Sequence, residues 1–274
     1  MRPVDVKKFK YNDKLASKRR QRLHVKTFFI GLVIIAVAGG IGYALFYAPW
    51  LKVTDISYEG LTDGHQADVE KVIDKALGYK ILGIPVGRDI LFVRAGSLVA
   101  DLTSQFSFIE DVSIQKDYFH TIKVTATERQ AAGVWCFDSS APIPDCRYFD
   151  SGGITFGHAI QSSGVLLLNI DDMRVQSASV SLATVDSRFL KAIQIVVPVF
   201  TSQNVKVKNI TIPVGTYTEL DILVGENYII KLSLDSDIQS QLDIFRIFRD
   251  QKITNGGLRP QYVDLRFDGR VYFK

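Results

Sequence analysis

An uncharged run of 22 residues, TFFIGLVIIAVAGGIGYALFYA at positions 27–48, constrains this chain more than any other feature. A helix of this length crosses a hydrocarbon core about 30 Å thick, so the run predicts a transmembrane helix. Residues 1–26, on its N-terminal side, hold ten Lys and Arg and two acidic residues. By the positive-inside rule, we expect these residues to form a cytoplasmic tail and the rest of the chain to lie outside the membrane, in the periplasm or the extracellular space.

A cleaved signal peptide is the competing interpretation of this run. The apolar part of a signal peptide is usually about 7–15 residues long and ends at a small-x-small cleavage site. The run here is longer, ends in the bulky sequence LFYAPW, and has Pro49 where cleavage would be expected. These features favour an uncleaved anchor. The small-xxx-small pairs Ala36/Gly40 and Ala38/Gly42 fit dimerisation of the helix and the general frequency of glycine in membrane helices equally well.

The basic charge of the chain belongs to the tail. Residues 1–26 carry a net +8 and the whole chain +4, so the remaining residues carry −4. A basic segment beside a membrane span favours contact with anionic lipid over nucleic acid. We therefore predict a membrane partner and no nucleic-acid partner.

The two cysteines of the chain, Cys136 and Cys146, lie nine residues apart in CFDSSAPIPDC. In an oxidising compartment, a close pair of this kind favours a disulfide that closes a short loop, and two free thiols are the alternative. A metal site would need more ligands, and no His lies near the pair in the sequence. We expect no metal and no cofactor.

Residues 49–130 predict a small α+β domain. Period-two alternation indicates strands, and apolar residues at helical spacing indicate helices. The expected order is strand, helix, helix, strand, strand, over residues 52–60, 68–78, 98–106, 109–118 and 120–129.

This order, directly outside a single membrane anchor, resembles a POTRA domain, a polypeptide-transport-associated module. The stretch FIEDVSIQKDYFHTIKVTATERQAAGVW is similar to the corresponding stretch of the bacterial cell-division proteins FtsQ and DivIB. The matching features are Val112 and Ile114, the basic Lys116, a turn at Tyr118–His120, and the pair Glu128–Arg129. Gln130 stands where the family usually has proline.

Residues 131–274 predict a second domain, a mixed β-sheet with helices. YFDSGGITF resembles the strand–turn with the pattern D-x-x-G that opens the β domain of the family, and the DLRF sequence near residue 267 is close to its terminal strand. Helical spacing indicates helices at residues 187–200 and 237–250, the first with an uncertain end at Pro198. The fold class is therefore α+β.

No catalytic constellation is found in the sequence. Walker-type loops, G-x-S-x-G and H-E-x-x-H are absent. The acidic pairs Asp171–Asp172 and Asp235/Asp237 are read as turn or capping residues, and Asp235–Asp237 before an apolar helical stripe suits a helix cap. We predict a protein that is not an enzyme.

The last residues, QYVDLRFDGRVYFK, alternate between apolar and polar side chains, which predicts one half-buried strand. From the pattern alone, this strand is equally a central strand, a covered edge or an open edge that accepts a strand from a partner. The resemblance implies the third: in the FtsQ family, this region receives a strand from the single-span coiled-coil protein FtsB or DivIC, which associates with FtsL.

By position, the resemblance makes Arg266, Phe267, Asp268, Gly269 and Arg270 the residues that bind this partner. Asp268–Gly269 is also a favoured hairpin turn, and a turn there would change the docking register. The expected function is a scaffold of the division machinery at the septum. A POTRA protein for polypeptide transport or outer-membrane assembly is the alternative, although the residues after Arg129 are few for a barrel and include helices. A membrane-anchored hydrolase would need catalytic residues that the sequence does not reveal.

Overall fold

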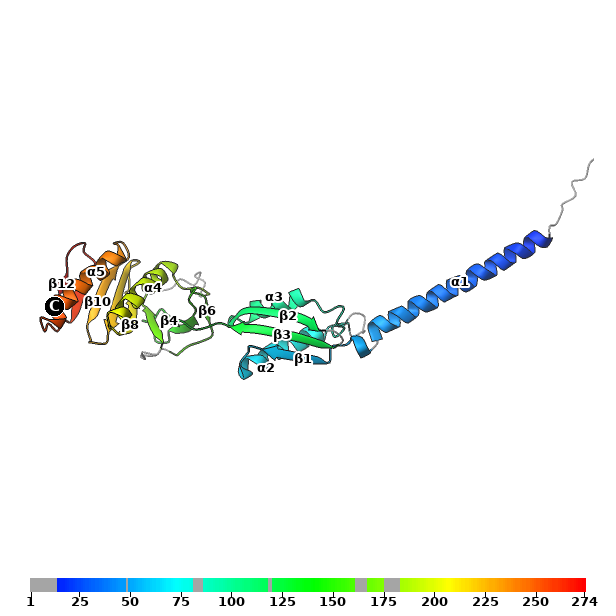
Figure 1. The fold of residues 1–274 in the computed structure, drawn as a ribbon, viewed down its shortest axis with the longest axis horizontal. Helices are drawn as coiled ribbons and strands as arrows, with labels where there is room; N and C mark the ends of the chain where they lie inside the picture. Colours follow the sequence, from blue (N-terminus) through cyan, green and yellow to red (C-terminus); the bar gives the residue numbers. More distant parts are fainter. Residues whose placement is uncertain (1–13, 48, 81–85, 118–119, 161–166, 175–182) are drawn as a thin grey trace, which may run out of the picture. The chain divides into compact units, whose positions relative to one another are not determined.

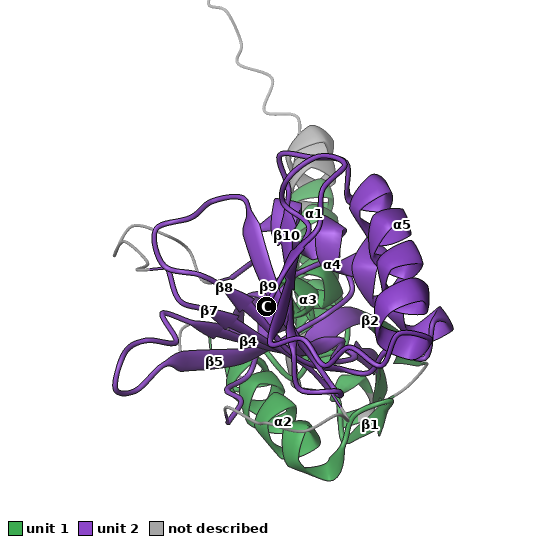
Figure 2. Cartoon of the chain, turned by 90° about the vertical axis from the view of Figure 1, so that its left-hand side faces the viewer, with its two compact units in different colours: residues 1–100, 113–125 green, residues 101–112, 126–274 purple. Residues whose placement is uncertain are grey.

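The computed structural model describes residues 14–47, 49–80, 86–117, 120–160, 167–174 and 183–274. The fold is α+β. The chain forms two compact units, residues 1–100 with 113–125 and residues 101–112 with 126–274 (Figure 2). This division passes through the smaller of two sheets, and the boundary expected between residues 130 and 131 stays a prediction.

The apolar run lies in α1, which spans Lys14–Tyr47. Its segment Arg22–Ala44 is long and apolar enough to cross a membrane, and an 18-residue window within it has a mean hydropathy of 2.1. None of this segment is buried inside the protein, so α1 is not the core helix of a globular domain. A short 3-10 helix, η1 (Pro49–Leu51), follows α1.

The small sheet and its two helices follow the order of elements that the sequence predicts. These elements are β1 (Asp55–Glu59), α2 (Asp63–Leu77), α3 (Ala95–Gln105), β2 (Ile109–Asp117) and β3 (Thr121–Glu128). The strands are ordered β1-β3-β2, and β1 runs parallel to β3. Ile122, Val124 and Ala126 are buried on one face of β3, because side chains two residues apart share a face.

The large sheet has nine strands, ordered β12-β11-β10-β9-β8-β7-β4-β5-β6. Their bounds are β4 (Gly133–Phe137), β5 (Asp145–Phe149), β6 (Thr155–Phe156), β7 (Leu168–Asp172), β8 (Val207–Ile212), β9 (Glu219–Val224), β10 (Ile229–Ser233), β11 (Tyr262–Asp264) and β12 (Tyr272–Phe273). Parallel and antiparallel pairs are mixed: β4 runs parallel to β7 and β10 parallel to β11, whereas β9 is antiparallel to both of its neighbours.

Two helices, α4 (Ser187–Ser202) and α5 (Ile238–Phe248), lie on one face of the large sheet (Figure 1). Each connects two adjacent parallel strands, α4 between β7 and β8 and α5 between β10 and β11. A π-helical segment, η2 (Arg249–Thr254), continues α5. The helix face of the sheet and the two helices form one core, whose members include Trp135, Phe189, Phe200, Phe245 and Val263.

Both helices begin at an aspartate cap. Asp237 accepts a hydrogen bond from the Ser240 backbone N–H at 2.7 Å, which confirms the predicted cap of α5. Asp186 caps α4 in the same way through the Arg188 N–H, at 3.1 Å. The helix α4 continues past Pro198 to Ser202, so this proline does not end it.

Candidate functional site

The two edges of the large sheet differ in what lies beside them. At the β6 edge, the Thr155 N–H donates to the Ala183 carbonyl at 2.9 Å, and the Val185 N–H donates to the Gly153 carbonyl, also at 2.9 Å. An isolated bridge pairs Ile154 with Thr184 between them. At the other edge, no strand among the described residues pairs with the outer side of β12. The β12 edge is therefore the open edge of this sheet.

The single terminal strand expected over residues 262–274 is wrong, because the structure folds this segment into a hairpin. β11 and β12 are antiparallel, with Val263 opposite Phe273 and Asp264 opposite Tyr272. The turn between them is closed by a hydrogen bond from the Arg270 N–H to the Phe267 carbonyl at 3.1 Å. Gly269 has a φ of +67°, a backbone conformation that glycine adopts without strain. The turn at Asp268–Gly269 is thus the alternative that forms.

The backbone of β12 directs hydrogen-bonding groups to the open side. The Lys274 N–H donates to the Tyr262 carbonyl at 3.4 Å, so the backbone hydrogen-bonding groups of Lys274 face β11. In an antiparallel pair, successive residues direct their N–H and C=O groups to opposite sides. The N–H and C=O of Phe273 therefore point away from β11, where an added strand would pair with them.

The side chains of β12 extend both faces of the sheet. Phe273 lies on the helix face, and its ring is 5.1 Å from that of Phe248 in α5. Tyr272 lies on the opposite face, with its ring 5.2 Å from that of Phe267 in an edge-to-face contact. Phe267, Tyr272 and Phe273 are 51%, 46% and 45% exposed. Three half-exposed aromatic rings at an open sheet edge form an apolar surface suited to a protein partner.

The flank of α5 adds to this surface. Phe245 packs against Phe200 of α4, with the ring centroids 5.3 Å apart. On a helix, residues three or four positions apart are neighbours, so Ile244 lies beside Phe248 on the flank away from Phe245, and Ile247 lies beside Ile244, farther round the helix. Ile247 is 52% exposed. A strand added beside β12 would therefore meet apolar side chains on its helix-facing side.

Arg266 lies at the start of the turn, and its guanidinium binds two acidic residues of the same chain. Its Nε and Nη2 donate to the two carboxylate oxygens of Asp264 at 2.9 and 2.7 Å, and its Nη1 lies 2.8 Å from Glu219 Oε2. The hydrogen bonds to Asp264 are the main reason that the pKa of Arg266 is raised. Burial alone would raise the pKa of Asp264, but the hydrogen bonds and positive charge of Arg266 hold it below its ordinary value.

The five residues predicted to bind a partner all lie between β11 and β12, not within a paired strand. Phe267, Asp268, Gly269 and Arg270 are exposed in the turn, whereas the Arg266 guanidinium faces Asp264 and Glu219. Sequence reasoning missed Tyr272, Phe273, Phe248 and Ile247 as members of this surface. The adjacent aromatic pair Tyr272–Phe273 was the available signal, because successive side chains of a strand point to opposite faces and the pair therefore places an aromatic ring on each face.

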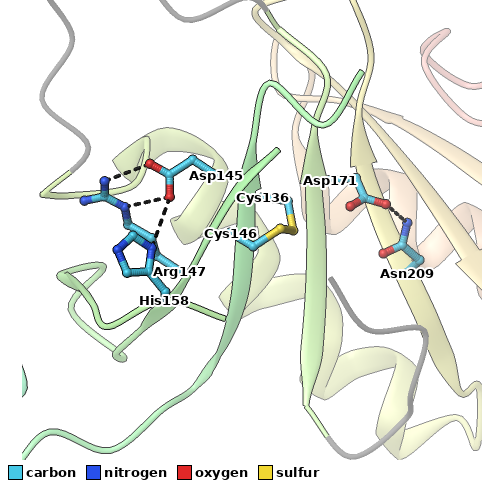
Figure 3. Close-up of a disulfide and its surroundings, with 7 residues drawn as sticks. All are labelled: Cys136, Asp145, Cys146, Arg147, His158, Asp171 and Asn209. Carbon is cyan, nitrogen blue, oxygen red and sulfur yellow. Dashed lines mark hydrogen bonds and ion pairs between the residues drawn. A yellow bond between two sulfur atoms is a disulfide. The ribbon is translucent and has the colours of Figure 1, made fainter. Parts of the chain in front are cut away.

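Cys136 and Cys146 lie directly opposite each other in β4 and β5 and form a disulfide (Figure 3). The sulfur atoms lie on the face opposite the helices, in a small cluster with Val134, Tyr148 and Ala159. Arg147 binds Asp145 through two hydrogen bonds of 3.1 and 2.7 Å (Figure 3). Among the described residues, no group of three His, Cys, Asp or Glu side chains is arranged to hold a metal ion.

The acidic residues considered as acid–base groups are engaged in the fold. Asp172 is buried and accepts from the Arg174 guanidinium at 2.8 and 2.7 Å. Asp171 accepts from the Asn209 side-chain amide at 2.7 Å (Figure 3). The first contact lies within the end of β7, and the second joins β7 to β8.

No protein-family model matches this chain, and no curated protein matches its sequence.

Proposed function

We propose that this protein is a membrane-anchored scaffold of the bacterial division machinery, of the FtsQ/DivIB type, that binds a strand of a partner at the β12 edge. The partner is an FtsB- or DivIC-like single-span coiled-coil protein, together with an FtsL-like protein. α1 is the anchor, with the basic tail in the cytoplasm and both units outside the inner membrane at the septum. The protein acts by binding and not as an enzyme.

One observation carries the proposal: the β6 edge of the sheet is covered by residues 183–185, whereas no strand of the described residues covers the β12 edge, which is lined by aromatic rings. Soluble proteins usually protect sheet edges, because an open edge pairs with other chains. A sheet that is protected at one edge and open at the other fits a site that is kept for a specific strand.

The hairpin changes which residues are expected to make the contact. Main-chain pairing with Phe273 would supply affinity and fix the register, while pockets for alternate side chains would supply specificity. On the helix face, a partner side chain would meet Phe273 and Ile247. On the other face, it would meet Tyr272 and Phe267.

Two further observations support the location outside the cytoplasm. α1 is long and apolar enough to span a membrane and has Lys and Arg on its N-terminal side. The Cys136–Cys146 disulfide suits an oxidising compartment.

The alternative, a POTRA protein for polypeptide transport or outer-membrane assembly, shares the order β1–α2–α3–β2–β3 with the division scaffold. Its clients would be unfolded polypeptides of many sequences and not one small membrane protein. The identity of the protein that binds at β12 therefore distinguishes the two functions.

Site-specific photocrosslinking in native membranes tests the proposal. A benzophenone amino acid replaces Phe273 in the full-length protein, and a matched variant carries it at Tyr217, which is 69% exposed outside the edge. We expect position 273 to crosslink to one small single-span coiled-coil protein, identified by mass spectrometry, and position 217 to give no such product. Crosslinking of position 273 to many outer-membrane polypeptides would favour the alternative, and the same product from both positions would refute the edge as the site.

A further inference from the structure

At the C-terminal ends of two strands, β7 and β11, the sequence Asp-x-Arg forms the same cluster, in which the Arg backbone N–H and its guanidinium both bind the Asp carboxylate. In the first, the Arg174 backbone N–H, Nε and Nη2 donate to Asp172 at 3.1, 2.8 and 2.7 Å. In the second, the corresponding groups of Arg266 donate to Asp264 at 3.1, 2.9 and 2.7 Å. We call each cluster an Asp-x-Arg clasp.

Each clasp is completed by a second acid from another element. Arg174 Nη1 lies 3.2 Å from Asp186 Oδ2, at the start of α4. Arg266 Nη1 lies 2.8 Å from Glu219 Oε2, at the start of β9. Both central carboxylates are buried, Asp172 to 1% and Asp264 to 6% exposure. Each clasp therefore joins the end of a strand to a second part of the fold, through charge-assisted hydrogen bonds.

Because the same clasp also occurs at β7, the contribution of Arg266 to the fold can be distinguished from a contribution to partner binding at the β12 edge. The clasp at β7 lies outside the β12 edge, so the arrangement does not depend on a partner strand. At β11 the same clasp fixes the backbone from Asp264 to Arg266, directly before the turn that carries Phe267. Three of the five guanidinium N–H donors point at Asp264 and Glu219, which leaves few for another molecule.

We infer that Asp264, Arg266 and Glu219 form a positioning clasp, which holds the β11–β12 turn so that Phe267, Tyr272 and the open side of Phe273 stay in register for an incoming strand. Arg266 acts through the hairpin and not as a contact residue. This inference rests on the proposed function of the edge.

Hydrogen exchange of the full-length protein tests the clasp without a partner. We compare Asp264→Asn, Arg266→Ala and Arg266→Lys with Arg174→Ala, which breaks the matching clasp elsewhere. Loss of the clasp should speed exchange of the hydrogen-bonded amides of residues 266, 270 and 274 by about tenfold or more, since local opening is set by local stabilisation. Arg174→Ala should lower the unfolding temperature but leave these amides protected. Unchanged exchange in both Asp264→Asn and Arg266→Ala would overturn the inference.

Crosslinking from position 273 then separates positioning from direct contact. Arg266→Lys keeps the charge but loses the planar fork. A positioning clasp predicts that Arg266→Lys, Arg266→Ala and Asp264→Asn all reduce the crosslink to a similar extent, because Asp264 is buried and out of reach of a partner. A crosslink that Arg266→Lys and Asp264→Asn both leave intact, while Arg266→Ala abolishes it, would show that Arg266 contacts the partner and would overturn the inference.

Glu219→Gln keeps the inference testable if Asp264→Asn does not fold, because it weakens the outer 2.8 Å ion pair and leaves the buried Asp264 in place. Faster exchange of the amides of residues 266, 270 and 274 in this variant supports the clasp. If the clasp variants speed exchange but the wild-type protein gives no crosslink from position 273, the proposed function fails and the clasp stands.

Discussion

Arg129 and Asp150 form an ion pair in which both side chains are nearly buried, at 11% and 13% exposure. Arg129 follows β3 and also donates to the carbonyls of Ser107 and Ile109, each at 3.2 Å. Asp150 lies in the turn between β5 and β6 and accepts from the Ile154 backbone N–H at 2.8 Å. The pair joins two sequences that resemble family motifs, Glu128–Arg129 and D-x-x-G, through one contact.

Breaking this pair should destabilise the large-sheet unit. Arg129→Met leaves Asp150 as a nearly buried charge without its counter-ion. Asp150→Asn leaves Arg129 without its counter-ion but keeps the side-chain oxygen that accepts hydrogen bonds in the turn. We expect each change to lower the unfolding free energy by about 3 kcal/mol. Urea unfolding followed by Trp135 fluorescence in a Trp50→Phe background measures this. The double variant should be far less destabilised than the sum of the two, and additive losses would argue against the pair.

Phe267→Asp should weaken partner binding and leave the fold intact. Phe267 is 51% exposed and contacts Tyr272 at the edge of the site, so we expect a loss of no more than about 1 kcal/mol of stability. The introduced carboxylate would lie beside apolar rings that a partner must cover. Co-purification of the coiled-coil protein measures binding, and circular dichroism measures folding. Tyr217→Asp, an equivalent change outside the edge, is the control and should bind normally. Unfolding of Phe267→Asp would mean that Phe267 is a core residue.

Removing the disulfide should cost about 2–3 kcal/mol, the loop-closure entropy for cysteines with a sequence separation of 10. Thermal unfolding of the variant with both Cys136→Ala and Cys146→Ala should therefore occur about 5–10 °C lower than in the wild type. Wild-type protein in excess reductant should match the variant. If reductant lowers the unfolding temperature of the variant as well, the effect does not come from this bond.

The clasp at the end of β11 should make stability depend on acid pH, because its central carboxyl, Asp264, has a lowered pKa. Burial alone would raise the pKa of Asp264, but Arg266 and Lys231 lower it below its ordinary value of 3.8. A carboxyl whose pKa is lower in the folded state stabilises the fold fully above its unfolded-state pKa, and this stabilisation is lost as the pH falls through the folded-state pKa. The unfolding free energy should therefore fall below about pH 4. Asp264→Asn should be less stable at pH 6 and show a smaller fall. An equal fall in both proteins would assign the acid sensitivity to other carboxyls.

The orientation of α1 is testable by fusion proteins. Alkaline phosphatase fused after residue 274 should be active, because it folds with disulfides only outside the cytoplasm, whereas a fusion at the N-terminus should be inactive. The protein should also stay in the membrane pellet after carbonate extraction. Release into the supernatant would identify residues 27–48 as a cleaved signal peptide. Neutral replacements of the Lys and Arg within residues 14–26 should give mixed orientation.

Local patterns in the sequence were enough to predict the membrane-length helix and the two helices of the large-sheet unit. The length and composition of residues 27–48 predict a membrane-length helix, because a helix rises about 1.5 Å per residue and the bilayer sets the span. Apolar residues at helical spacing placed α4 and α5, and Asp237 marked the start of α5. β4 was missed because all five of its residues are buried. A strand that is covered on both faces carries no alternation.

The terminal hairpin was decided only by tertiary structure. Opposite residues in β11 and β12 have the same parity, 263 with 273 and 264 with 272. Odd-numbered side chains therefore face the helices in both arms, so period-two alternation is identical for one long strand and for this hairpin. The choice depends on long-range contacts: Phe273 packs on Phe248, and the Arg266 fork closes on Asp264 and Glu219. Which edge of a sheet stays open likewise depends on pairing between distant strands, a property that no local pattern contains.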